Sequence, residues 1–298
     1  MNEVRVQWLT QDQSLWESDW LRYIFSDVAP CIDVEFDPRA IKTDKNTVLI
    51  CNHGVNYRWV LEKLRQNGKQ YVIMLLSDEN LRDPCEWIHD PSCKGLIRNY
   101  INPYLMGHPK VQVIGLGYKK DFTRCLDSTL DRSLLWSFAG TLHGTRKEVV
   151  ELFKDSGPNK IHACSGFGAA DGLGTKDYVK MLQKSKYALI PEGQDSLDSF
   201  RLYEALEAGC VPITVNNSKQ FIVRPSYWHG IFDRNTKLPF ITGDTWDECR
   251  NKLEQETPET LKEKQSECRA LWDTYKNLWK AEIVRICGKI QSPTLASE

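Results

Sequence analysis

Residues 196–215 read SLDSFRLYEALEAGCVPITV, a stretch that holds a complete loop–helix–strand unit. A polar loop leads into the helical segment FRLYEALEA, Gly209 ends the helix, and the apolar strand VPITV follows. A glycine just past a helix favours the left-handed conformation that closes it. Arg201 lies in the first helical turn, where helix polarity disfavours a cation. Arg201 and Glu204, one turn apart, therefore form either a solvated surface pair or part of a ligand site at the helix mouth.

The same alternation of apolar strands and amphipathic helices runs through the whole chain. The apolar runs are rich in Val, Ile and Leu and mostly do not alternate with polar residues, as in parallel strands covered on both faces. Strands are predicted at 4–9, 32–36, 47–52, 71–77, 111–117, 134–140, 160–166, 187–193 and 211–215. Helices are predicted between them, for example at 58–68, 146–157 and 177–185. Strands that alternate with helices predict an α/β fold with right-handed crossovers.

The strands and helices fall into two series. Residues 81–110, rich in Pro, Gly and aromatic residues, interrupt the first series, and a polar connector at 127–133 precedes the second. We therefore predict a first domain at 1–128, a second at 129–265, and a C-terminal helical segment at 266–290. Apolar residues recur at three- and four-residue spacing in the last segment, which predicts one buried helix face.

Composition and charge exclude several classes of protein. The chain has 298 residues, 41% of them hydrophobic, which is enough for two cores. A net charge of -1 disfavours a nucleic-acid partner and a polybasic membrane anchor. The ten cysteines are scattered singly, which predicts reduced thiols without zinc-binding spacing. We find no signal peptide and no run of about 18 apolar residues, so we expect a soluble, cytoplasmic chain, or a Golgi-lumenal one if it is a truncated ectodomain.

A second loop–helix unit also has an arginine in the first turn of its helix. FAGTLHGTRKEVV, residues 138–150, places Gly140 and Thr141 after a strand and Arg146 in the first turn of a helix. Backbone N–H groups at a helix N-terminus bind phosphate, and a cation there gains from a bound anion. The alternative is a tight turn with Arg146 in solvent. Because ligands of open α/β sheets bind at the carboxyl ends of the strands, we expect both arginine-bearing loops at one edge.

Candidate acid–base residues follow two apolar strands of the first series. CNHGVNYR contains His53, and LLSDENLRD contains Asp78 and Glu79. A general base for a hydroxyl needs an imidazole or a carboxylate at such a position, and we rank Asp78 first, then Glu79 and His53. Alternatively, Asp78 caps the next helix and His53 bonds a loop. The chain has no P-loop, no GxSxG motif and no acidic pair at a strand end, so no metal and no cofactor is predicted.

The stretch KSKYALIPEGQDSLDSFRLYEALEAGCVPITV resembles the signature of the exostosin-like (GT47-like) glycosyltransferases. LLWSFAGTLHGTRKEVVELF, VIGLGYK and LLSDE are also similar to segments of that family, and the similarity covers most of residues 70–220. The resemblance implies a GT-B fold, in which two doubly wound Rossmann-like domains face each other across a cleft and the last helix crosses back to the N-terminal domain. It also implies a UDP-sugar donor in the C-terminal half and a glycan or glycoprotein acceptor in the N-terminal half.

The resemblance further implies roles for individual residues. Glu204 would bond the ribose hydroxyls, while Arg201 and Arg146 would face the diphosphate. Further donor contacts would come from Gly140, Thr141, Ser196, Ser199 and Phe200. Transfer would invert the anomeric carbon and need no metal, because the arginines and the helix dipoles would stabilise the leaving pyrophosphate.

The sequence leaves open which sugar is transferred and whether the chain is catalytic. Similarity to family members that move xylose favours a xylosyltransferase, while glucuronyl, galactosyl and N-acetylglucosaminyl donors stay open. A soluble bacterial or virus-encoded relative, or a truncated ectodomain, would fit a chain with no anchor. A non-catalytic nucleotide- or sugar-binding protein of the same fold is the alternative from another class, whereas a hydrolase would need a nucleophile or metal cluster that the sequence does not suggest.

Overall fold

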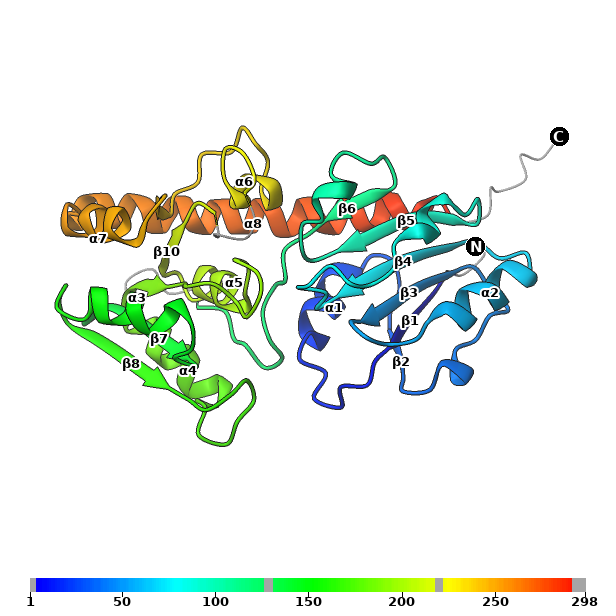
Figure 1. Cartoon of the computed structure of the whole chain (residues 1–298), viewed down its shortest axis with the longest axis horizontal. Helices are drawn as coiled ribbons and strands as arrows, with labels where there is room; N and C mark the ends of the chain where they lie inside the picture. The colour runs from blue at the N-terminus through cyan, green and yellow to red at the C-terminus, as the bar shows by residue number, and fades with distance from the viewer. Residues whose placement is uncertain (1–3, 126–130, 218–221, 291–298) are drawn as a thin grey trace. The chain divides into compact units, whose positions relative to one another are not determined.

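The computed structural model describes residues 4–125, 131–217 and 222–290 (Figure 1). The chain forms two compact units, which we call unit 1 (residues 1–115 and 276–298) and unit 2 (residues 116–275). The boundary that the sequence predicts, between residues 128 and 129, lies outside the described residues.

The segment 116–125 belongs to unit 2 because its backbone bonds to the helix that contains Arg201. The N–H of Lys119 donates to a carboxylate oxygen of Glu204 at 3.4 Å, and the N–H of Cys125 donates to the carbonyl of Glu207 at 3.0 Å. These bonds hold Lys119 and Cys125 beside that helix, within unit 2.

Unit 1 is built on a six-stranded, parallel sheet in the order β2-β1-β3-β4-β5-β6. Its strands are β1 (Arg5–Leu9), β2 (Asp33–Glu35), β3 (Thr47–Asn52), β4 (Tyr71–Leu76), β5 (Cys93–Arg98) and β6 (Val111–Val113). Its helices are α1 (Ser18–Phe25) and α2 (Arg58–Gln66), with short 3-10 turns η1 (Pro38–Ala40), η2 (Glu86–His89) and η3 (Pro103–Leu105). The sequence predicts the strands of unit 1 except β5, which lies in the segment taken as an interruption.

The two faces of this sheet are buried by different helices. On one face, alternate residues of β3 and β4, such as Leu49 and Ile73, pack with Leu61 and its neighbours on α2. The other helices are α1 and the end of α8 (Pro258–Gly288), whose residues from 276 onward belong to unit 1. Trp20 of α1 meets Trp279 of α8 edge to face, with ring centroids 6.2 Å apart. The predicted return of the last helix to the N-terminal domain is thereby confirmed.

Unit 2 is built on a five-stranded parallel sheet in the order β11-β10-β9-β7-β8. Its strands are β7 (Leu134–Gly140), β8 (Asn159–Ala163), β9 (Ser185–Leu189), β10 (Val211–Val215) and β11 (Ile241–Gly243). Its helices are α3 (Thr145–Phe153), α4 (Thr175–Gln183), α5 (Phe200–Glu207), α6 (Tyr227–Ile231), α7 (Trp246–Glu254) and the first part of α8. The apolar pattern of the sequence does not predict β11, α6 or α7.

Helix α5, which carries Arg201 and Glu204, is held firmly on the sheet. Gly209 takes φ +72° just after the helix and closes it, as expected. The buried guanidinium of Arg132 donates to the carbonyls of Ala208 (2.7 Å) and Ser185 (2.6 Å), so it links the end of α5 to the start of β9. Among the described residues, no helix is long and apolar enough to cross a membrane.

Candidate active site

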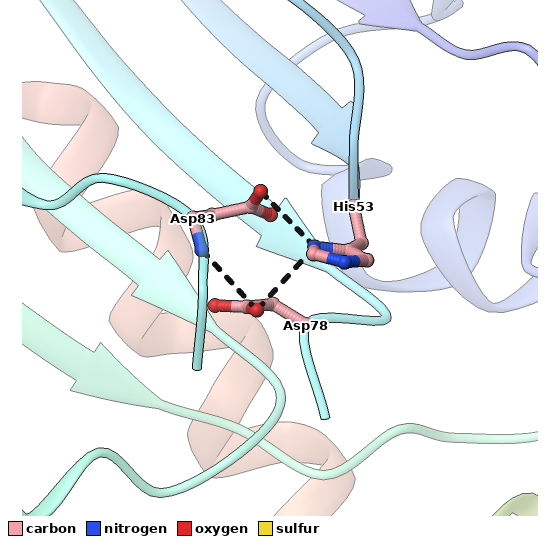
Figure 2. Close-up of side chains that lie close together, drawn as sticks. All are labelled: His53, Asp78 and Asp83. Carbon is pink, nitrogen blue, oxygen red and sulfur yellow. Dashed lines mark hydrogen bonds and ion pairs between the residues drawn. The ribbon is translucent and has the colours of Figure 1, made fainter. Parts of the chain in front are cut away.

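In unit 1, His53, Asp78 and Asp83 come together where β3 and β4 end (Figure 2). The Nδ1 atom of His53 lies 3.0 Å from Oδ1 of Asp83 and 3.4 Å from Oδ1 of Asp78. These strands are neighbours in a parallel sheet, so their carboxyl ends meet at the same edge. The imidazole is 34% exposed, whereas the side chains of Asp78 and Asp83 are 2% and 7% exposed. The histidine is therefore the member of the cluster that a substrate can reach.

Both carboxylate oxygens of Asp78 are engaged by the protein. Oδ2 pairs with the buried guanidinium of Arg98 on β5 at 3.1 Å, and Oδ1 accepts the N–H groups of Arg82 (2.8 Å) and Asp83 (3.3 Å). Burial raises the pKa of Asp78, and the bond from Arg82 and the charge of Arg98 oppose this shift. Asp78 thus closes the turn after β4, which resembles the capping role that the sequence left open. Its contacts favour a supporting role over proton abstraction, although the sequence ranks it first.

The other two carboxylates near this edge differ in their surroundings. Glu79 is half-buried and accepts the hydroxyl of Tyr100 at 2.9 Å. Asp83 also accepts the N–H of Gly54 at 3.4 Å, and its Oδ2 is buried with no hydrogen-bond partner among the described residues. Asp83 carries no local signal in the sequence, because only the turn closed by Asp78 brings it back to His53.

The cluster brings together three side chains of types that bind metal ions. The ligand atoms of His53, Asp78 and Asp83 all lie within 4.8 Å of one another. A metal ligand needs a lone pair directed at the ion. The oxygens of Asp78 already accept two backbone N–H groups and a guanidinium. The arrangement therefore suits the orientation of an imidazole better than the coordination of a metal.

A buried carboxyl group supports the same strand ends from within. Oε1 of Glu17 accepts the hydroxyl of Ser77 at 3.0 Å and the amide of Asn52 at 3.5 Å. These residues immediately precede Asp78 and His53, so Glu17 ties together the two strand ends that carry the cluster. Burial raises the pKa of Glu17, and the bond from Ser77 opposes this shift.

In unit 2, Arg201 lies against the carboxyl end of β7. Its Nε donates to the carbonyl of Ala139 at 3.0 Å, and its guanidinium carbon lies 5.4 Å from the centroid of the Phe138 ring. Gly140 has φ +148°, and a Cβ atom there would lie 2.8 Å from Nη2 of Arg201. The glycine at the end of the strand therefore makes room for the guanidinium, and the first turn of α5 meets the loop after β7.

Arg146, the second arginine that the sequence singled out, lies by the same loop. It is buried, its Nε donates to the carbonyl of Glu192 at 2.9 Å, and its Nη1 donates to the hydroxyl of Thr141 at 2.7 Å. Partial desolvation and the positive charges of Arg146 and Arg201 lower the pKa of His143. His143 directly precedes Gly144, the N-cap residue of α3, and the sequence does not single it out.

Glu204 is not part of a solvated surface pair. It is 1% exposed, and burial raises its pKa, while the charges of Lys119 and Arg201 oppose the shift. The N-cap residues of α3 and α5, Gly144 and Ser199, make no side-chain hydrogen bond to the first turn of their helix. Two helix N-termini without a side-chain bond from the N-cap residue, two arginines and a carboxylate thus gather at one edge of the sheet of unit 2.

The remaining predicted donor residues lie in the loop that leads into α5. The hydroxyl of Ser196 accepts the N–H of Asp198 at 3.2 Å and lies 3.4 Å from the hydroxyl of Tyr227. Ser199 occupies the N-cap position, and its hydroxyl oxygen accepts a hydrogen bond from Nη1 of Arg201 at 3.5 Å. Phe200 begins the helix. The structure thus places all the predicted donor residues around the ends of β7 and β9.

Comparisons with known proteins bear on this arrangement. Residues 125–248, less than half of the chain, match the model of the Exostosin GT47 domain. Exostosin-1 of Drosophila melanogaster is 48% identical over 42 residues, which cover 14% of this chain and 5% of exostosin-1. The matched segment is therefore a small part of that protein.

Two solved structures resemble the chain over nearly its full length. A crystal structure of an α1,3-fucosyltransferase has a TM-score of 0.55 and 11% identity, and covers 97% of this chain and 91% of its own. A structure of an α1,3-fucosyltransferase with GDP-fucose has a TM-score of 0.52 and 12% identity. The match covers 99% of this chain and 92% of the fucosyltransferase chain.

At such low identity these likenesses show the fold, and they confirm the predicted GT-B fold with its two Rossmann-like sheets. The matched Exostosin GT47 domain agrees with the predicted enzyme class, a glycosyltransferase. The predicted resemblance to exostosin-like glycosyltransferases is confirmed for residues 125–248.

Proposed function

We propose that the chain transfers a sugar from a nucleoside diphosphate sugar to a hydroxyl group of a glycan, with inversion at the anomeric carbon. The observation that carries this proposal is the pair of arginines, Arg146 and Arg201, in the first turns of two helices beside Glu204. Fixed positive charge of this kind suits a diphosphate. Among nucleotide sugars we favour a UDP-sugar, with xylose as the first sugar to test.

The donor half of the reaction belongs to unit 2. Arg201 and Arg146 would bind the diphosphate, and Glu204 would accept hydrogen bonds from the ribose hydroxyls. As the bond between the anomeric carbon and the phosphate oxygen breaks, the leaving diphosphate gains negative charge. Each charge-assisted contact to that oxygen contributes about 2–4 kcal/mol of transition-state stabilisation. Two arginines and two helix dipoles would therefore perform the role of a divalent metal.

The acceptor half belongs to unit 1, and we assign the base to His53. A carboxylate 3.0 Å from Nδ1 favours the tautomer that carries its proton on Nδ1, which leaves Nε2 able to accept one. Nε2 would take the proton of the acceptor hydroxyl while the hydroxyl oxygen bonds to the anomeric carbon. As this bond forms, the bond from the anomeric carbon to the phosphate oxygen breaks, and the nucleoside diphosphate leaves with its electron pair. Asp78 and Glu79, which the sequence also put forward, would support this edge.

The experiment that tests the donor assignment is a thermal-shift screen of UDP- and GDP-sugars, each with EDTA and with a divalent metal. The GDP series is included because a solved structure with a similar fold is an α1,3-fucosyltransferase with GDP-fucose. We expect at least one nucleotide sugar to stabilise the protein, equally with and without EDTA. Arg201→Ala should abolish that shift.

Arg234→Ala is the matched control for this screen. Arg234 is exposed in the loop that enters β11 at its amino end, the opposite edge of the sheet from Arg201. The proposal fails if Arg201→Ala binds the nucleotide sugar as well as the control does. A shift that requires metal would overturn the metal-independent mechanism. Binding without transfer to any acceptor would support a non-catalytic nucleotide- or sugar-binding protein.

A further inference from the structure

Phe167 is an exposed aromatic residue in the glycine-rich loop between β8 and α4. Its side chain is 67% exposed. The loop has its own hydrogen bonds: the carboxylate of Asp171 accepts the N–H of Ser165 at 2.8 Å and its hydroxyl at 2.9 Å. These two bonds contribute to a lower pKa for Asp171, with the hydroxyl bond as the larger cause. The loop therefore presents the phenyl ring from a defined backbone.

The surroundings of Phe167 connect it to the proposed donor site. Its ring lies nearly parallel to that of Phe200, with centroids 6.4 Å apart and an interplanar angle of 19°. Nζ of Lys119 lies 5.6 Å from the centroid of the Phe167 ring. Phe200 directly precedes Arg201, and the backbone N–H of Lys119 donates to Glu204. The aromatic ring and the ammonium group are thus neighbours of the groups assigned to the ribose and the diphosphate.

The topology of unit 2 leads to the same placement. Strand β8 pairs with β7, so the loop after β8 leaves the sheet at the same edge as the loop after β7 that contains Gly140. The backbone joins the two loops directly, because the N–H of Cys164 donates to the carbonyl of Gly140 at 3.2 Å. A ligand with its diphosphate at Arg201 therefore has Phe167 within the same rim of loops.

The side chains of Phe167 and Lys119 are suited to binding a planar heterocycle. A base stacks on an exposed aromatic face, and an ammonium group near that face attracts the carbonyl oxygens of the ring. We propose that Phe167 and Lys119 form the stacking face for the nucleobase of the donor. This inference rests on the proposed function, and it adds a base-recognition element to the groups for the diphosphate and the ribose.

Calorimetric titration with two probes tests this inference. UDP or GDP, whichever binds the wild-type protein more tightly, carries the base, whereas inorganic pyrophosphate lacks it. Phe167→Ala should weaken nucleotide binding about tenfold, since stacking on an aromatic side chain contributes roughly 5- to 150-fold in affinity. The same variant should bind pyrophosphate like the wild type. Phe167→Tyr should restore nucleotide affinity, and Ile161→Ala, an exposed apolar change on β8, is the control.

The possible outcomes separate this inference from the proposed function. Unchanged nucleotide affinity in Phe167→Ala overturns the stacking role while leaving the donor site in place. Equal losses of nucleotide and pyrophosphate affinity also overturn it, because the change would then act on the loop as a whole. If the wild-type protein binds neither UDP nor GDP, the proposed function fails, and the base-recognition element fails with it.

Discussion

Replacement of Asp83 by Asn tests how the exposed histidine of unit 1 is prepared to act as a base. The change keeps the size of a buried side chain but removes the negative charge 3.0 Å from Nδ1 of His53. A hydrogen bond to a charged group contributes about 1.5–3 kcal/mol. Since about 1.4 kcal/mol corresponds to a factor of ten in rate, we expect turnover to fall roughly 10- to 150-fold.

The assay is the initial rate of nucleotide release at saturating donor and acceptor. The KM for the donor should stay close to the wild-type value, because the proposed donor residues lie in unit 2. Asp44→Asn is the matched control, since Asp44 is 66% exposed and precedes β3 at the amino edge of the sheet. His53→Ala in the same assay shows the full contribution of the imidazole.

Two results would refute this reasoning in different ways. If Asp83→Asn retains wild-type turnover while His53→Ala is inactive, the imidazole acts without help from Asp83. If His53→Ala retains wild-type turnover, the base is another group, and Glu79, bonded to Tyr100, becomes the next residue to test.

Two further predictions concern the donor loop and the buried carboxyl group of unit 1. Gly140→Ala should raise the Kd for nucleotide several-fold, because the added Cβ would displace the guanidinium of Arg201. Gly174→Ala, whose added Cβ would lie in open space, should leave the Kd unchanged. Calorimetry measures the Kd of both variants. Glu17→Gln should gain stability relative to the wild type as the pH rises from about 4.5 to 7. Burial raises the pKa of Glu17, so the native state holds this proton more tightly and the wild type loses stability as the carboxyl group ionises, whereas Gln cannot ionise. Urea unfolding at both pH values measures the gap, and a gap independent of pH would contradict the reasoning.

The sequence predicts the parts of the fold that depend on local patterns. Helix α5 and its neighbouring strands follow from the apolar spacing of residues 196–215 and the glycine that ends the helix. Strand β5 is different, because Gly95 and Arg98 weaken its apolar pattern. A Cβ at Gly95 would lie 2.6 Å from Ile286, so a residue almost two hundred positions away in the sequence covers this strand.

The candidate site also contains residues that the local sequence predicts and residues that it does not. Arg146 and Arg201 stand out in the sequence because a cation in the first turn of a helix needs an explanation, and both are found around the end of β7. Asp83 and Phe167 have no such local signal. Asp83 reaches His53 through a turn closed by Asp78. Phe167 is a single aromatic residue in a glycine-rich loop, and no periodic pattern marks it as functional.

Product formation tests the central claim most directly. Wild-type protein and Arg201→Ala are each incubated with the nucleotide sugar that gives the largest thermal shift and with an array of glycan acceptors, and mass spectrometry detects the elongated glycan. We predict one added sugar per acceptor for the wild type and a rate roughly 30- to 900-fold lower for Arg201→Ala, from the loss of about 2–4 kcal/mol of transition-state stabilisation. Equal rates for the two proteins, or tight nucleotide binding with no elongated product from any acceptor, would contradict the account.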